Sequence, residues 1–352
     1  MPATATAAAA SSPELLRRLE SLCRGSDLGS LAARLADLAS LVAPDVARFE
    51  EALGALRTGA SAVERGAGHL LALGGKRLRP ICVALAARLG TGFDERALSL
   101  AVAAELVHAA TLLHDDVVDL GETRRGAPCA RVVFGNAISI FAGDWLLVDA
   151  LKRVRAANLD GVLEALLDVI EEMILAESRQ LERRGRLDTT EAEWLEVARG
   201  KTAALFRWAM IAGARAGGLD ADACAALERY GESLGVAFQA TDDLLDVAGD
   251  PAATGKAPFA DVREGKLTYP LIVGQRREPA LTPLLSRALS EPDADLLAEI
   301  RATLERTGSL EETRSLALLY AARAKDALLA LPAGPARDAL ATVADATVHR
   351  PT

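Results

Sequence analysis

The chain carries the same aspartate pattern twice, each time inside a long apolar segment with helical periodicity. The two copies read Asp115-Asp116-Val117-Val118-Asp119 and Asp242-Asp243-Leu244-Leu245-Asp246. Aspartate is a poor helix former because its short side chain competes for nearby backbone groups. At this spacing the carboxylates crowd one side of a helix, where like charges about one turn apart repel. Two such clusters therefore predict helices whose carboxylates are held together by bound cations.

Helical periodicity extends over most of the chain and is interrupted mainly by glycine and proline. From Ala43 onward, apolar residues recur at three- and four-residue spacing, and no convincing alternating strand appears. Aromatic residues make up only 4% of the sequence, which suits packed helices better than sheets. We therefore predict an all-α fold, a large helical bundle around a central cavity across which the two clusters could face each other.

The termini and the overall charge set the expected organisation and location. Residues 1–40 read as an N-terminal extension, partly disordered, with a short helix around residues 13–22, and residues 41–352 read as one catalytic domain. No secretory signal or transmembrane segment is expected, and the four scattered cysteines form no CxxC pair. We expect a cytoplasmic protein with reduced thiols, whose net charge of −9 argues against binding nucleic acid.

Basic residues lie near the first aspartate cluster in the sequence. Lys76 and Arg79 follow two glycines and can converge on one anion, although a helix end with solvated charges explains them equally well. Arg124 and Arg125 follow the cluster in a predicted turn. There they either compensate the charge of the aspartates or bind a phosphate beside a metal.

Two of the four histidines also fall in the segment that contains the first cluster. His108 lies seven residues before Asp115 on the same helical face, so a role near a bound anion is plausible. A histidine on an apolar face is more often a core residue with its hydrogen bonds satisfied, and His114 is interpreted in this way.

Taken together, the motifs resemble those of the trans-polyprenyl diphosphate synthase family over about residues 45 to 335. The motifs that carry the resemblance, in chain order, are GGKRLRP, ELVHAATLLHDDVVD, RRG, FGN…AGDWL, GKTAALF, FQATDDLLD, GDPAATGK and EGKLTYP. The resemblance implies an isoprenoid synthase-like fold and a prenyltransferase that joins isopentenyl diphosphate to an allylic diphosphate. It also implies Mg²⁺, which favours oxygen ligands and is commonly held by few carboxylates together with phosphate and water.

The same resemblance implies roles for individual residues. The catalytic set comprises Asp115, Asp116, Asp119, Lys201, Asp242, Asp243 and Asp246, and the implied metal ligands are Asp115, Asp116, Asp119 and Asp242. Positions around the allylic diphosphate are Arg124, Lys201, Thr202, Gln239, Lys256 and Lys266, and those of the isopentenyl diphosphate pocket are Lys76, Arg79, His108 and Arg125. Phe259 departs from the family pattern, since many relatives have glycine three residues after the lysine that matches Lys256.

The length of the product depends on the residues that precede the first cluster. On a helix, Thr111 lies one turn and Val107 two turns below Asp115. Short-chain relatives place a bulky aromatic one turn below the first aspartate, where this chain has Ala110 and Thr111. The small residues therefore favour a medium-to-long product, octaprenyl-like and suited to a quinone side chain, although ordinary close packing of helices also explains them.

Alternatives within and outside this activity are a short-chain farnesyl or geranylgeranyl diphosphate synthase, a class I terpene cyclase and a non-catalytic subunit of a heteromeric synthase. A cyclase would leave GGKRLRP without a use, and non-catalytic subunits typically lose aspartates that are all present here. The resemblance implies a homodimer, and a long-chain product is one that membrane enzymes could take over.

Overall fold

The computed structural model describes residues 29–57, 60–249, 258–291 and 293–349. Helices account for nearly all regular structure in these ranges, and the two strands among them, β1 (Thr123–Arg124) and β2 (Ala127–Pro128), form one short antiparallel hairpin. The all-α prediction is therefore confirmed. The helix expected around residues 13–22 and the predicted site residue Lys256 lie outside the described residues.

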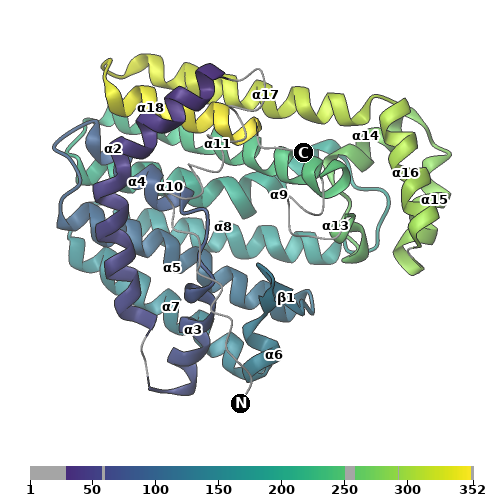
Figure 1. Ribbon diagram of the computed structural model, residues 1–352, viewed down its shortest axis with the longest axis horizontal. Coiled ribbons are helices and arrows are strands. Elements are labelled where there is room, and N and C mark those ends of the chain that lie inside the picture. Colours follow the sequence, from purple (N-terminus) through teal and green to yellow (C-terminus); the bar gives the residue numbers. More distant parts are fainter. Residues whose placement is uncertain (1–28, 58–59, 250–257, 292, 350–352) are drawn as a thin grey trace. The chain divides into compact units, whose positions relative to one another are not determined.

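The chain divides into two compact units. Their elements are labelled in Figure 1 and coloured by residue number. The first contains the described residues up to Leu163 together with Ala212–Leu219. Its elements are α2 (Gly29–Gly54), η1 (Ala55–Arg57), α3 (Ala62–Ala72), α4 (Leu78–Arg88), α5 (Glu95–Val118), β1, β2, α6 (Ala130–Phe134), α7 (Asn136–Ala157) and the end of α10 (Ala204–Ala216). The expected boundary at residue 40 falls inside α2.

Helix α5 is the centre of the first unit and ends in the first aspartate cluster. Asp94 caps its start by accepting a 2.9 Å hydrogen bond from the backbone N–H of Ala97, which satisfies one of the donors left open at a helix N-terminus. The helix packs most extensively against α7. Gly143 of α7 permits this approach, because a Cβ at that position would lie 2.3 Å from Nε2 of His114. Close packing thus fixes the direction of the cluster-bearing end of α5.

By length and composition alone, α5 could cross a membrane, and it is the one helix in the described ranges that passes this test. Two thirds of its most apolar stretch, 67%, is buried within the structure. Buried core helices of this length have the same composition, so the apolar character of α5 is accounted for by packing.

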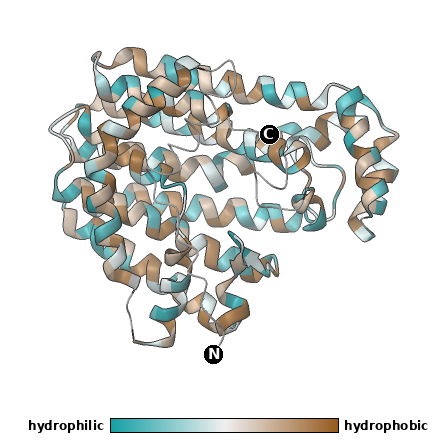
Figure 2. Ribbon diagram, in the orientation of Figure 1, coloured by the Kyte–Doolittle hydropathy of each residue, from teal (hydrophilic) through white to brown (hydrophobic). Residues whose placement is uncertain are grey.

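The second unit contains Glu164–Ile211 and the described residues from Asp220 onward. Apolar and polar bands alternate along its helices, as the amphipathic pattern requires (Figure 2). Its elements are α8 (Val162–Glu182, from residue 164), α9 (Glu191–Val197), the π-helical segment η2 (Ala198–Ala203), the start of α10, α11 (Ala221–Ala248), α13 (Ala260–Arg263), α14 (Tyr269–Arg277), α15 (Leu281–Ser290), α16 (Ala294–Arg306), α17 (Ser309–Ala327), η3 (Leu328–Ala330) and α18 (Pro335–Val348).

Helix α11 carries the second aspartate cluster and packs against α17 and η2. Its approach to η2 depends on Gly235, where a Cβ would lie 2.3 Å from the backbone Cα of Ala203. No side chain fits in that space without moving one backbone away from the other. Glycine at this position therefore sets the distance between the second cluster and the segment that contains Lys201 and Thr202.

Candidate active site

Asp116 is the buried member of the first cluster. The residue is 2% exposed, and its Oδ1 accepts hydrogen bonds from Nε of Arg124 at 2.9 Å and from Nη2 at 2.6 Å. Its Oδ2 is buried and has no hydrogen-bond partner among the described residues. Asp115 and Asp119 are half-buried at the end of α5, where the N–H of Asp119 donates to the carbonyl of Asp115 at 2.8 Å. The cluster thus combines one oriented carboxylate with two that solvent reaches.

The β1–β2 hairpin places the paired arginines beside this cluster. Arg124 ends β1, and Arg125 and Gly126 form the turn with φ values of 54° and 78°. The turn directs the Arg124 side chain back to Asp116, eight positions earlier in the sequence. Burial lowers the pKa of Arg124, but the hydrogen bond and the charge of Asp116 raise it more, so the pKa is raised overall. Arg124 thus holds the aspartate in place and brings a positive charge to the site.

The GGKRLRP segment leads into α4 and brings a residue that the sequence reading did not single out. Arg77 precedes α4 in the left-handed region (φ 52°), is 4% exposed, and donates through Nε to Glu50 at 2.9 Å and through Nη1 to Glu105. A buried guanidinium requires such carboxylate partners. The signal that could have found it is Glu105, an acid in the middle of an otherwise apolar helix.

Gly75 lies against the guanidinium groups that surround this loop. A Cβ at Gly75 would be 3.1 Å from both Nη atoms of Arg125 and 3.2 Å from Nη1 of Arg77. The structure therefore brings the GGKRLRP loop and the hairpin together, as an anion site built from both requires. Of the two predicted binders in the loop, Lys76 is exposed and Arg79 is half-buried.

His108 lies among these arginines. Its pKa is lowered well below the usual value of 6.5, first by loss of hydration and then by the positive charges of Arg79, Arg125, Arg124 and Arg77. The imidazole is therefore neutral at pH 7 and can donate one hydrogen bond without adding a further charge. His114, by contrast, faces α7, where Nε2 lies 3.2 Å from the carbonyl oxygen of Ile140 and 3.3 Å from Asp144.

The three residues tied to product length lie on α5 before the cluster. Val107 and Ala110 are buried, at 1% and 2% exposure, whereas Thr111 is half-buried. The hydroxyl of Thr111 donates to the carbonyl of His108 at 2.8 Å. Thr111 is thus the most accessible of the three positions.

The second cluster, in the second unit, contains two aspartates with strongly perturbed acidity. Burial and the charge of Asp261 raise the pKa of Asp243 to about 7 and that of Asp246 to about 8, against the lowering effect of their hydrogen bonds. Oδ1 of Asp246 accepts from the N–H of Ala260 at 2.9 Å and so caps α13. Asp242 is half-buried on the same helix.

The other predicted binders of the second unit lie on η2, α11 and the loop before α14. Nζ of Lys201 donates to Oε1 of Gln180 at 2.8 Å and forms an ion pair with Glu177. Thr202 donates to Gln239 at 2.7 Å. Lys266 forms a 2.7 Å ion pair with Glu264. Both lysines are therefore held in defined positions by neighbouring acceptors.

The structure shows how Phe259 is tolerated at the position, three residues after Lys256, where many relatives have glycine. Its φ of 57° is the left-handed conformation in which glycine is favoured and which costs other residues about 1 to 2 kcal/mol. Its ring is 2% exposed, in a cluster with Val247, Val262 and Leu271. Burial of a phenylalanine contributes roughly 1.5 to 3 kcal/mol, which offsets the backbone cost.

The carboxylates fit the magnesium that the sequence implies. No three His, Cys, Asp or Glu side chains in the described ranges already surround one point. Magnesium does not need such a cage, because it keeps several waters and is bound by one or two carboxylates plus substrate phosphates. The buried, unpartnered Oδ2 of Asp116 is an acceptor of this kind.

The fold is all-α, and its first unit brings together an aspartate oriented by Arg124, further arginines and a neutral histidine, groups that suit an anion beside a divalent cation. A model of the polyprenyl synthetase family matches residues 61–305. The chain belongs to the polyprenyl synthetase family and is a prenyltransferase, which confirms the resemblance found in the sequence.

Individual relatives span nearly the whole chain. The short chain isoprenyl diphosphate synthase of Methanothermobacter thermautotrophicus is 38% identical over 292 residues, 81% of this chain and 90% of that protein. The nonaprenyl diphosphate synthase of Mycobacterium tuberculosis is 34% identical over 342 residues, 95% of this chain and 99% of that protein. The polyprenyl synthase of Caulobacter crescentus, crystallised with calcium and isoprenyl diphosphate, superposes with a TM-score of 0.85 at 37% identity, covering 90% of this chain and 98% of that one.

Proposed function

We propose that this prenyltransferase is a Mg²⁺-dependent, long-chain all-trans polyprenyl diphosphate synthase, octaprenyl-like in product size and serving a quinone side chain. The observation that carries the chain length is the absence of any aromatic residue on α5, where Thr111 and Ala110 precede the oriented Asp116. The nonaprenyl diphosphate synthase relative, aligned over 95% of the chain, supports a long product. The short chain relative keeps a short product as the competing outcome.

The residues of the first unit suit the binding of isopentenyl diphosphate. Lys76, Arg79 and Arg125 would supply positive charge. Arg77 stabilises the GGKRLRP loop through its ion pairs with Glu50 and Glu105. Neutral His108 adds a hydrogen bond. Guanidinium groups bind diphosphate oxygens in a fixed fork, which orients the ligand as well as attracting it.

Asp115, Asp116, Asp119 and Asp242 would hold the magnesium, with Arg124 keeping Asp116 in orientation. When bound, Mg²⁺ would supply electrostatic stabilisation of the departing diphosphate. Lys201, Thr202, Gln239, Lys256 and Lys266 complete the proposed allylic site. Glu177 and Gln180 hold the ammonium group of Lys201, so Lys201 would bring a positioned positive charge to this site.

An assay with the purified chain tests the proposal. Farnesyl diphosphate, labelled isopentenyl diphosphate and Mg²⁺ should give incorporation of label into products longer than geranylgeranyl diphosphate, resolved by chain length. A single short product would favour the short-chain alternative. Absence of incorporation by the chain alone would overturn the proposed activity and favour a subunit of a heteromeric synthase.

We also propose that the chain is a homodimer. Helix α7 exposes Ile140, Phe141 and Val148, and helix α8 exposes Leu167, Ile174, Leu175 and Leu181. Apolar side chains repeated along one helix are costly in water, and an identical partner is the simplest cover because a twofold interface uses the same surface on both copies.

Sedimentation equilibrium checks this assignment. The protein should sediment as a dimer, and Ile174→Glu, at a residue 62% exposed, should shift it towards monomer at micromolar concentration. Leu329→Glu is the matched control, because Leu329 is 75% exposed on η3 outside these two helices. A monomeric wild-type protein, or equal dissociation of both variants, would contradict the assignment.

A further inference from the structure

Asp243 differs from the other cluster aspartates in the number of groups that bind it. Its Oδ1 accepts from Nε2 of Gln239 at 2.8 Å, and its Oδ2 accepts from Nε1 of Trp194 at 2.7 Å and from the backbone N–H of Tyr269 at 3.0 Å. The residue is 1% exposed. A carboxylate has about four acceptor sites, and three of those of Asp243 are occupied by donors of the protein.

These donors fix the polarity of a hydrogen-bond chain. Indole and backbone N–H groups can only donate, so the carboxylate must accept at Oδ2. Oδ1 accepts from the NH₂ group of Gln239, and this orientation of the amide turns Oε1 of Gln239 towards Thr202. The hydroxyl of Thr202 then donates to that oxygen at 2.7 Å. With its hydrogen committed, Thr202 presents only oxygen lone pairs to any further partner.

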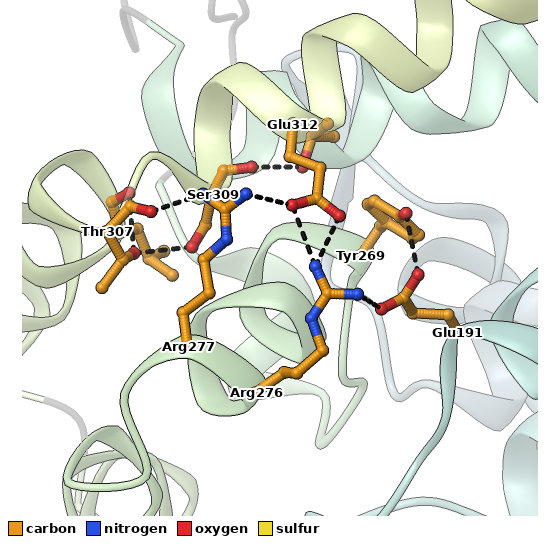
Figure 3. Close-up of polar contacts among 9 residues, drawn as sticks. Glu191, Tyr269, Arg276, Arg277, Thr307, Ser309 and Glu312 are labelled. Atoms are coloured by element: carbon orange, nitrogen blue, oxygen red, sulfur yellow. Dashed lines mark hydrogen bonds and ion pairs between the residues drawn. The ribbon is translucent and has the colours of Figure 1, made fainter.

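The two fixed donors are themselves held by a second polar network (Figure 3). The hydroxyl of Tyr269 donates to Glu191 at 3.1 Å, and Arg276 joins Glu191 to Glu312. The ring of Tyr269 packs on Trp194 with centroids 4.8 Å apart. Arg276 and Arg277 share Glu312, so α9, α14 and α17 are tied at this point. The N–H groups that face Asp243 therefore have little freedom to move.

The Thr202 end of this hydrogen-bond chain is fixed by the close approach of α11 to η2. Gly235 contacts the backbone of Ala203 without space for a Cβ, and Gln239 follows one turn later, beside Thr202. A residue on α11 is in this way placed in register with the π-helical segment. The polarity set at Asp243 is therefore transmitted to Thr202 over two hydrogen bonds.

We propose that Asp243 is a positioning residue for prenyl transfer that acts through Gln239: it orients the Gln239 amide so that Thr202 and Gln239 present oxygen lone pairs. The proposal rests on the proposed function. Oxygen lone pairs favour positive charge, and positive charge develops on the allylic carbon as its bond to the diphosphate breaks. Asp243 thus contributes to the rate through the orientation of its neighbours.

Asp243→Asn tests this orientation because it exchanges donor and acceptor in the hydrogen bonds between residue 243, Gln239 and Thr202 while keeping the same number of hydrogen bonds. The asparagine oxygen must still accept from Trp194 and Tyr269, so its NH₂ group faces Gln239. Gln239 then flips and donates to Thr202, whose hydroxyl hydrogen is released. We expect kcat to fall on the order of 10²-fold, while KM for both diphosphates and the Mg²⁺ concentration for half-maximal activity stay within threefold.

A double-mutant cycle with Gln239→Leu separates this action from a general structural effect. Once Gln239 is absent, Asp243→Asn should change kcat by less than threefold. An Asp243→Asn enzyme with wild-type kcat would overturn the proposal. So would a Mg²⁺ requirement raised in proportion to the lost activity, which would make Asp243 a metal ligand, or an equal loss in both backgrounds.

The indole N–H of Trp194 supplies a readout that does not depend on turnover. In ¹⁵N-tryptophan spectra the chain gives three indole signals, and Trp194→Phe identifies the one that is lost. Asp243→Asn should move this signal upfield as the charge of its acceptor is removed, and an unmoved signal would overturn the contact. Wild-type protein without prenyl transfer would refute the proposed function, whereas the indole shift would still report the geometry at Asp243.

Discussion

Asp116→Ala is expected to lower kcat for prenyl transfer on the order of 10³-fold, the largest loss from any single carboxylate of the first cluster. Two effects combine in this variant. The buried Oδ2 that fits a magnesium ligand is lost, and Arg124 loses the oxygen that it binds at 2.6 and 2.9 Å. Because the carboxylate is 2% exposed, leaving the guanidinium unpaired should also lower the free energy of unfolding by about 3 kcal/mol.

Asp116→Asn separates the two effects. The asparagine oxygen can still accept from Arg124, so thermal unfolding should lie closer to wild type while the loss of activity persists. Glu278→Gln is the control for charge neutralisation, because it breaks an ion pair with Arg306 on the surface, which typically contributes below about 1 kcal/mol. Steady-state kinetics and thermal denaturation measure both quantities. An Asp116→Asn enzyme with more than a tenth of wild-type kcat would contradict the assignment of Asp116 as a metal ligand.

The helical class could be predicted because its signals are local. Apolar spacing marks the helices, and Gly74-Gly75, Gly90–Gly92 and Gly217-Gly218 mark breaks at which the structure also ends its helices. The π-helical form of η2 could not be read in the same way, because it shifts the hydrogen-bond register without altering composition. Whether the two clusters face each other remains a prediction.

The partner of Asp116 was among the alternatives that the sequence left open, because Arg124 lies only eight residues away, whereas the partner of Asp243 could not be predicted. Asp116 and Asp243 occupy the same place in the shared aspartate pattern, yet one binds Arg124 from the hairpin and the other binds Trp194, 49 residues earlier. The motif therefore identifies the site but does not show which role each aspartate has in it.

The GGKRLRP loop shows the same limit for charged residues. Its basic side chains look alike in sequence, and Arg77 turns inward because Glu50 and Glu105 meet it there. Glu105 lies 28 residues after Arg77, so only tertiary packing reveals the pair. Sequence reasoning finds which residues gather at such a site and leaves open which of them bind ligand and which hold the others in place.

Thr111→Tyr is expected to change the dominant product from long-chain to short-chain prenyl diphosphate. The residue lies about 6 Å from Asp115 along the helix axis and is half-buried, so a larger side chain at this position can extend into space beside the helix. A phenol there would occupy the path that we propose for the growing chain. Thr111→Val, which has nearly the same volume, should keep the wild-type product even though it removes the hydrogen bond to the carbonyl of His108.

A second position tests whether depth along α5 sets the length. Val107 lies about 6 Å further from the cluster than Thr111, so Val107→Phe should stop elongation later and give products of intermediate length. Ala110→Tyr should also shorten the product. Because Val107 and Ala110 are 1% and 2% exposed, overpacking at either position should cost about 1 to 3 kcal/mol of stability. Radiolabelled products resolved by chain length give the order directly. If all three variants that enlarge a side chain give the same product lengths as the wild-type enzyme, the growing prenyl chain does not follow this face of α5. If Val107→Phe gives shorter products than Thr111→Tyr, the prenyl chain follows this face in the opposite direction.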